Sequence, residues 1–215
     1  MKTIGIIGAG EVGSHIASAA IAVNYDVVIS NSRGPETLTE LVRKLGPKAR
    51  AATPEEAARA GDFVVIAVPL KLKNNMPTEA LSGKIVIDTN NYMNWRDGNF
   101  PVIDSGEKTV HELRQEQLTA SKVVKALTHI QAPRILTWAR PKGEKDRVAL
   151  AVSSNYPEAV KLVSGLYDEF GFDSVNNSPL SESWRTAPGQ PAWKQERHNE
   201  MELIKNLRIA RRLFP

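Results

Sequence analysis

The chain has 215 residues, a formal net charge of +4 at neutral pH and no cysteine. This length suits one α/β domain or one with a small appendage, and the absence of cysteine excludes a disulfide framework and a thiolate nucleophile. The four histidines are scattered, which argues against a metal site. No apolar run approaches the ~20 residues of a membrane span, and the first is too short for a signal peptide. We therefore expect a soluble, cytoplasmic protein that binds neither nucleic acid nor a membrane.

The first thirty-three residues have the organisation of a nucleotide-binding unit. A short apolar run, Thr3–Ile7, is typical of a strand, residues 12–23 carry apolar residues at helical spacing, and Asp26–Ser30 is a second strand. Between the first strand and the helix the sequence reads Gly8-Ala9-Gly10-Glu11-Val12-Gly13. Strand, glycine turn, helix and strand within about 30 residues form the context in which this motif predicts dinucleotide binding.

Each glycine of this turn has a separate expected role. Gly8 permits the tight turn, Gly10 lets a pyrophosphate approach the backbone, and Gly13 lets the helix pack closely on the strand. The pyrophosphate would then lie on the free N–H groups and the positive dipole end of the helix. The alternative is that the glycines only make a tight turn, but the position of the motif directly after a strand favours the cofactor.

The end of the second strand predicts NADP rather than NAD. An NAD site uses an acidic residue there, and Asp26, which begins the strand, points away from it. Asn31, Ser32 and Arg33 instead offer amide, hydroxyl and guanidinium donors, and the planar fork of arginine suits a phosphate. A polar loop that caps the next helix, with Ser32 as N-cap and Pro35 in the first turn, is an alternative that does not exclude this.

The rest of the chain alternates strand and helix, which predicts a doubly wound, mainly parallel sheet with helices on both faces. Further strands are expected at residues 48–52, 63–68, 84–88, 122–127, 147–153 and 171–175, and helices at 35–45, 54–60, 76–81, 109–118, 157–170 and 199–212. We expect a nucleotide-binding domain over residues 1–130 and a small C-terminal α+β part over residues 131–215 that serves the substrate or dimerisation.

Ligands of such sheets lie beyond the carboxyl ends of the strands. This singles out the segment Ala67-Val68-Pro69, after the strand at 63–68, and the pair Thr89-Asn90. The nicotinamide is expected near Val68, Pro69 and Asn90, with Asn90 or Thr89 bonded to its ribose. An Asx-type turn at the strand end is the alternative for these polar residues.

Two later features are candidates for a second substrate. Residues 91–107 are long, polar and rich in turn formers, so we expect them to form a wall or lid of a pocket. His129 follows a strand at the mouth of the sheet and is a candidate contact to the hydride acceptor, the alternative being a histidine satisfied by backbone. His15, His111 and His198 are expected on the surface.

With these motifs in hand, the chain resembles the deazaflavin-dependent NADP oxidoreductases, the NADP:coenzyme F-420 oxidoreductases and their bacterial relatives. The resemblance extends over nearly the whole length. It rests on residues 6–13, 31–33, 67–69, 88–90 and 123–127, and on the tail pattern Pro179-Leu180, Trp184-Arg185 and Pro188-Gly189-Gln190-Pro191.

The resemblance implies a Rossmann-type domain, NADP(H) as cofactor, and hydride transfer to or from a flavin-like ring, either deazaflavin F-420 or a flavin. It also implies a homodimer formed through the C-terminal part. Ser32 and Arg33 match the positions that the family uses for the 2′-phosphate, whereas Thr37 lies near a place where a basic residue is often found. The protein would mainly position the two rings, since the cofactor supplies the redox chemistry.

Three alternatives bear comparison with this sequence. β-Hydroxyacid dehydrogenases and imine reductases share the glycine motif but add a long helical domain, for which the roughly 85 residues after Ile130 are too few and too rich in proline and glycine. A reductase of small carbonyl compounds is a second alternative. A sensor that binds NADP(H) without turnover is the third, and it would lack an open pocket over the nicotinamide.

Overall fold

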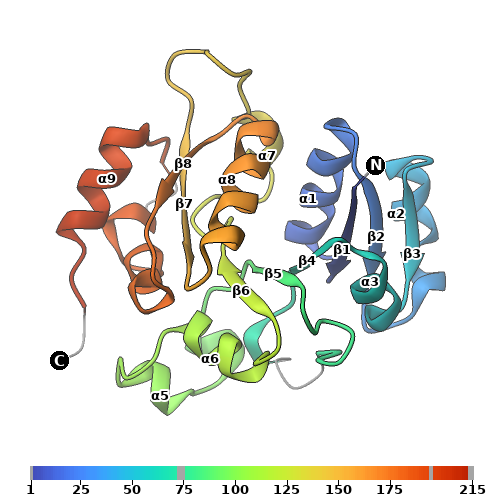
Figure 1. The fold of residues 1–215 in the computed structure, drawn as a ribbon, viewed down its shortest axis with the longest axis horizontal. Coiled ribbons are helices and arrows are strands. Elements are labelled where there is room, and N and C mark those ends of the chain that lie inside the picture. The colour runs from blue at the N-terminus through green and yellow to red at the C-terminus, as the bar shows by residue number, and fades with distance from the viewer. Residues whose placement is uncertain (1, 72–75, 194–195, 213–215) are drawn as a thin grey trace.

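A computed structural model describes residues 2–71, 76–193 and 196–212. The described residues form an eight-stranded sheet in the order β3-β2-β1-β4-β5-β6-β7-β8 (Figure 1). The strands are β1 Thr3–Ile7, β2 Asp26–Ser30, β3 Ala49–Ala52, β4 Phe63–Ile66, β5 Ile85–Asp88, β6 Lys122–Lys125, β7 Ala149–Ser154 and β8 Asp173–Asn176.

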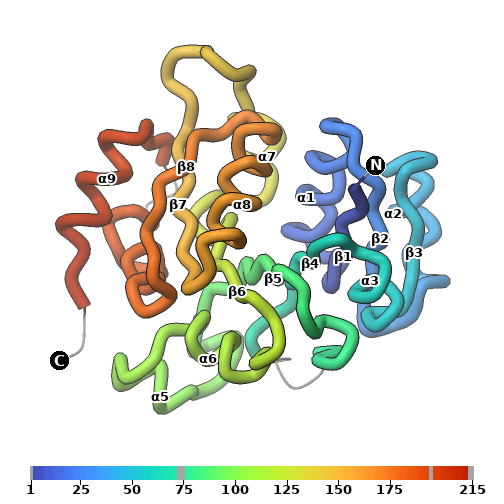
Figure 2. The backbone as a smooth tube through the Cα atoms, viewed as in Figure 1, coloured from blue at the N-terminus to red at the C-terminus, as the bar shows by residue number. Residues whose placement is uncertain are grey.

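Helices connect the strands and cover the sheet. The α-helices are α1 Glu11–Ala22, α2 Thr39–Leu45, α3 Pro54–Ala60, α4 Asn94–Asp97, α5 Pro101–Asp104, α6 Val110–Gln117, α7 Arg134–Thr137, α8 Pro157–Phe170 and α9 Glu200–Ile209. Short 3₁₀ helices are η1 Pro35–Leu38, η3 Leu180–Thr186 and η4 Pro191–Trp193. Figure 2 shows the path of the chain from β5 through α5 and α6 to β6.

The predicted doubly wound sheet is confirmed. Strands β1 to β6 pair in parallel, β7 runs antiparallel to β6, and β8 runs parallel to β7. The inner strands are apolar on both faces because both faces are covered by helices. The parallel arrangement brings the carboxyl ends of β1, β2, β4, β5 and β6 to one edge of the sheet, where ligands of such folds bind.

Two cores, one on each face, hold the layers together. On one face Ile16 of α1 and Val163 and Tyr167 of α8 join a buried cluster with residues of the central strands. On the other face Ala58 of α3 and Leu118, directly after α6, pack on the same strands. Helix α9 packs on β7 and β8. These two strands continue the same sheet, so the residues after 130 extend it instead of forming a separate layer.

The helices α3 and α6 each begin at a capping residue that the sequence supplies. Thr53 and Thr109 each form a capping box with the glutamate three residues later, at the start of α3 and α6. Helix α8 has the bounds expected from its apolar spacing and ends at Gly171, which adopts a left-handed φ of 91°.

Some expected elements differ. The predicted helix over residues 76–81 is wrong, because this stretch forms only hydrogen-bonded turns. The stretch ends at Gly83, whose φ of +75° stops the chain from continuing in a helix. The predicted loops over 91–107 and 132–148 contain the short helices α4, α5 and α7.

Candidate functional site

The turn between β1 and α1 can be built only with glycine at two of its positions. Gly8 has a φ of +114°, and a Cβ placed on it would lie 2.4 Å from the carbonyl oxygen of Ala67. A Cβ on Gly13 would lie 1.8 Å from the carbonyl oxygen of Gly8. Both contacts are far shorter than van der Waals separation, so these glycines hold the turn against α1 and against the segment after β4.

Gly10 is different because nothing in the fold requires it to be glycine. Its backbone has φ −75° and ψ −166°, and a Cβ added there meets no described atom within 4 Å. Gly10 is the N-cap of α1, and no side chain among the described residues caps this helix end. Open space in front of free N–H donors at a helix start fits a pyrophosphate, as the glycine motif predicts.

Hydrogen bonds to the Asn31 side chain fix the conformation of the segment after β2. Its Oδ1 accepts hydrogen bonds from the backbone N–H groups of Arg33 (2.9 Å) and Gly34 (3.1 Å). The side chains of Ser32 and Arg33 are exposed, at the same sheet edge as Gly8. The N-cap of η1 is Gly34, so the alternative of Ser32 as N-cap is wrong, although Pro35 does begin that helix.

The predicted nicotinamide segments also lie at this edge. Ala67, Val68 and Pro69 follow β4 and are half-buried, and the Ala67 N–H donates to Ile7 of β1 at 2.8 Å. The hydroxyl and backbone N–H of Thr89 both donate to the carbonyl of Ile66, at 3.0 and 3.1 Å. Thr89 therefore joins two strand ends, which leaves Asn90 as the polar side chain that borders open space.

Asn90 is hydrogen-bonded to Asp88, which forms a buried ion pair with Arg114. Asp88 Oδ1 accepts from the backbone N–H of Asn90 (3.1 Å) and from its Nδ2 (2.5 Å), which is the Asx-type turn considered from the sequence. Asp88 Oδ2 accepts from Arg114 Nε at 3.0 Å, and both side chains are fully buried. Burial alone would raise the pKa of Asp88, but the Arg114 charge holds that pKa below its usual value.

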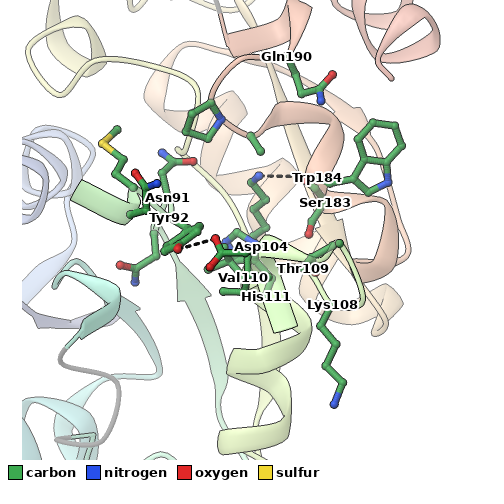
Figure 3. A pocket seen from close by; sticks show the side chains of 18 of the residues that line it. Asn91, Tyr92, Asp104, Lys108, Thr109, Val110, His111, Ser183, Trp184 and Gln190 are labelled. Atoms are coloured by element: carbon green, nitrogen blue, oxygen red, sulfur yellow. Dashed lines mark hydrogen bonds between the residues drawn. The ribbon is translucent and has the colours of Figure 1, made fainter. Parts of the chain in front are cut away.

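A cavity of about 410 Å³ opens next to Asn90. Figure 3 shows its walls, with Asn91 and Tyr92 after β5, Asp104 and residues 108–111 from the α5–α6 segment, and Ser183, Trp184 and Gln190 from the tail. Part of the 91–107 segment therefore forms a wall, as predicted. Its lining is mainly apolar and aromatic, and it includes Met93, Trp95, Ile103, Val110, Trp184, Ala187 and Pro188.

The cavity also has a polar group of side chains. Lys125, at the end of β6, is 3% exposed and donates from Nζ to the carbonyl of Ser183 at 2.7 Å. Burial lowers the pKa of Lys125 to about 7, partly opposed by Asp88. Burial, and then the Lys125 charge, lower the pKa of His111 to about 3, so this ring is neutral. His111 Nε2 and Ser183 Oγ are buried without a hydrogen-bond partner among the described residues.

The histidines are placed differently from expectation. His129 is buried, and its Nε2 accepts from the Ala151 N–H at 2.9 Å, which is the backbone-satisfied alternative; it does not line the cavity. Its role as an acceptor contact stays a prediction that this geometry does not support. The expectation that His111 and His198 lie on the surface is wrong, because both are buried. His15 is half-buried on α1.

Sequence reasoning missed Lys125, His111 and Arg114 as site residues. A signal for Lys125 was present, because a lysine inside an apolar strand that is covered on both faces must find a partner or lose its charge. The contribution of the tail carried no such signal. Arg212, three residues beyond the end of α9, donates to the carbonyls of Gly106 and Ser181 and lines the cavity.

Fold and turn together define a dinucleotide-binding protein of the Rossmann type. Residues 3–92 match the model of the family described as NADP oxidoreductase, coenzyme F-420-dependent. The matched family is the one that the motifs resemble, and the match covers the amino-terminal part of the chain.

Several known proteins are similar to this chain. Protein YjhV of Escherichia coli is 38% identical over 53 residues, which span 25% of this chain and 39% of that protein. Protein SMa0349 of Sinorhizobium meliloti has a structure with a TM-score of 0.77 and 28% identity, covering 93% of this chain and 97% of that one. A structure described as a candidate F-420-dependent NADP reductase from an Arthrobacter species has a TM-score of 0.72 and 23% identity, covering 85% and 87%.

The described residues also bear on two other classes of site, membrane spans and metal sites. Every helix there is too short or too polar to cross a lipid bilayer. No group of three or more histidine, aspartate or glutamate side chains in those ranges is placed to hold a metal ion.

Proposed function

We propose that this protein is an NADP(H)-dependent oxidoreductase that transfers hydride between the nicotinamide and a small acceptor held in the cavity beside Asn90. The observation that carries the proposal is the position of this cavity. It borders Asn90 at the sheet edge where the glycine turn, Ser32, Arg33 and the segment Ala67–Pro69 also lie. A ring bound there would meet a nicotinamide that lies across the ends of β4 and β5.

The cofactor assignment rests on three groups of residues. Gly8, Ala9, Gly10, Glu11, Val12 and Gly13 would hold the pyrophosphate, Asn31, Ser32 and Arg33 the 2′-phosphate loop, and Ala67, Val68, Pro69 and Asn90 the nicotinamide end. NADP(H) supplies the hydride chemistry when it is bound. The chain would orient the rings and exclude water, and the apolar walls of the cavity suit both tasks.

A flavin-like acceptor, deazaflavin F-420 or a flavin, is the first choice for the second substrate. The family match and the aromatic lining, with Tyr92, Trp95 and Trp184, support a flat conjugated ring. A small carbonyl compound is the second choice. The sensor alternative is less favoured, because it predicts no open pocket at the nicotinamide end.

The test is turnover with a panel of acceptors. Purified protein is mixed with NADPH and, separately, deazaflavin, FMN, FAD, a quinone and an aldehyde, and NADPH oxidation is followed by absorbance. We expect at least one conjugated ring to be reduced. Tight NADPH binding together with no oxidation in every mixture would overturn this proposal and favour the sensor.

We further propose a cytoplasmic homodimer formed through residues 131–215, with no membrane or nucleic-acid partner. Met201 and Ile209 of α9 are exposed large apolar side chains in this part of the chain, and such side chains often mark interfaces. Sedimentation analysis of the wild type and of Met201→Glu tests the proposal. A monomeric wild type would contradict it.

A further inference from the structure

The Lys125 side chain is a buried cation that faces a cavity. Asp88 and Lys125 are paired in the parallel register of β5 and β6, so their side chains leave the same face of the sheet, toward α6 and η3. Lys125 has an ammonium group with three donors, and its hydrogen bond to the carbonyl of Ser183 uses one of them. The cavity is the space that this side chain borders.

The carboxylate of Asp88, which neighbours Lys125, is already hydrogen-bonded to other residues. Asp88 accepts from Arg114 and from Asn90, both over hydrogen-bond distances. Asp104, which also lines the cavity, accepts from the Tyr92 hydroxyl at 2.7 Å. The charge of Lys125 is therefore not neutralised by a direct carboxylate contact in the described part of the chain, which leaves it able to act on a ligand.

Two further polar atoms point to a ligand in the same place. His111 Nε2 and Ser183 Oγ belong to residues that line the cavity, and both atoms are buried and unpartnered among the described residues. Leaving such atoms unpaired costs about 1–3 kcal/mol each. A ligand that brings its own polar edge into the apolar cavity would satisfy them, whereas a purely apolar ligand would not.

From this arrangement we propose that Lys125 is a catalytic residue, the proton donor to an acceptor that carries a conjugated carbonyl group. This inference rests on the proposed function and names its acceptor class, which includes quinones, enones and the carbonyl-bearing ring of flavins and deazaflavins. His111 and Ser183 are positioning residues that hold the polar edge of the acceptor near Lys125.

The chemistry balances without a further reagent. The acceptor gains a hydride from C4 of the reduced nicotinamide, which is oxidised, and a new bond to hydrogen forms at the far end of the conjugated system. The displaced π electron pair moves to the carbonyl oxygen, which takes a proton from Lys125 Nζ. Lys125 is left neutral and regains a proton from water. The sum is one acceptor, one NADPH and one proton giving the reduced acceptor and NADP⁺.

The titration of Lys125 supports this role. A donor works best when its pKa lies near the working pH, and burial brings that of Lys125 to about 7. The titratable groups that interact with it are Asp88 on β5, His111 on α6 and His129 after β6, and Arg114 on α6 is paired with Asp88. Since the donor must be protonated, kcat/KM should fall as pH rises above about 7.

The experiment compares Lys125→Met and Lys125→Gln with the wild type, and uses Lys122→Met on the same strand as control, because Lys122 lies outside the cavity. With the acceptor that the panel identifies, we expect kcat/KM to fall about 100-fold or more in both Lys125 variants. The fall above neutral pH should disappear in both, while NADPH affinity stays unchanged. The control should keep the wild-type rate and pH profile.

A second readout does not depend on turnover. The pKa of Lys125 is lower in the folded than in the unfolded chain, so the wild type gains stability relative to Lys125→Met as pH rises from about 7 toward 10. Near-wild-type kcat/KM with an unchanged pH profile in folded Lys125→Met would overturn the inference. A wild type that binds NADPH but reduces no acceptor would instead overturn the proposed function.

Discussion

At the scale of single residues, substitution of Arg33 tests whether the protein prefers NADP(H) to NAD(H). It is exposed at the end of β2, in a loop that Asn31 holds by two hydrogen bonds to the backbone. Arg33→Ala should weaken NADPH binding roughly 10- to 150-fold, since a hydrogen bond to a charged group contributes about 1.5–3 kcal/mol, and should leave NADH unchanged. Fluorescence titration with both nucleotides measures this.

The matched control for that substitution is Arg43→Ala, which removes an exposed arginine from α2 that forms an ion pair with Glu40. It should bind both nucleotides as the wild type does. If Arg33→Ala weakened NADH and NADPH equally, the arginine would not be reading the 2′-phosphate.

At the scale of elements, Tyr92 stabilises the segment that contains α4 and α5 through contacts with Phe100 and Asp104. Its hydroxyl donates to Asp104 at 2.7 Å and accepts from the Phe100 N–H at 3.3 Å, and its ring meets Phe100 edge-on at 5.7 Å. Tyr92→Phe removes the hydroxyl and keeps the ring. We expect KM for the acceptor to rise by roughly 2- to 10-fold, the equivalent of about 0.5–1.5 kcal/mol.

Steady-state kinetics checks this, with NADPH affinity expected to stay constant. Tyr156→Phe is the control, because Tyr156 lies at the start of α8 and outside the cavity. An unchanged KM together with faster amide exchange over α5 would show that the hydroxyl orders the segment without shaping the acceptor site.

Elements also show what the sequence could and could not predict. The glycine turn, the positions of α3 and α6 and the full extent of α8 follow from local patterns, and all were predicted. The ion pair between Asp88 and Arg114 joins residues 26 positions apart, and no local pattern specifies such a pairing. The cavity wall built from η3 and Arg212 was missed for the same reason. His111 was wrongly expected on the surface, because its burial depends on tertiary contacts with Asp88 and Lys125 that no local pattern of α6 reveals.

At the scale of the whole molecule, buried neutral histidines should make the fold sensitive to acid. Burial lowers the pKa of His111 and of His129 from 6.5 to about 3. Between these values the unfolded chain binds more protons than the folded one, so the free energy of unfolding falls as pH falls from 6.5 toward 3. Each histidine contributes a slope of up to about 1.4 kcal/mol per pH unit.

Denaturant unfolding of the wild type and His129→Gln at several pH values tests this. Glutamine keeps an acceptor for the Ala151 N–H but does not titrate, so its slope in acid should be shallower by about 1.4 kcal/mol per pH unit. Above pH 7 the difference between the two proteins should be constant. Parallel curves down to pH 4 would show that His129 is protonated in the folded state.

The central claim is that the turn between β1 and α1 binds the pyrophosphate of NADP(H), and Gly10 tests it most directly. A Cβ added at Gly10 meets no described atom within 4 Å, and the same holds at Gly165 in α8. Calorimetric titration of NADPH into the wild type, Gly10→Ala and Gly165→Ala should show one tight site per chain, a loss of at least tenfold in affinity only for Gly10→Ala, and unchanged melting of that variant. No heat with the wild type, or equal affinity in all three proteins, would contradict the account.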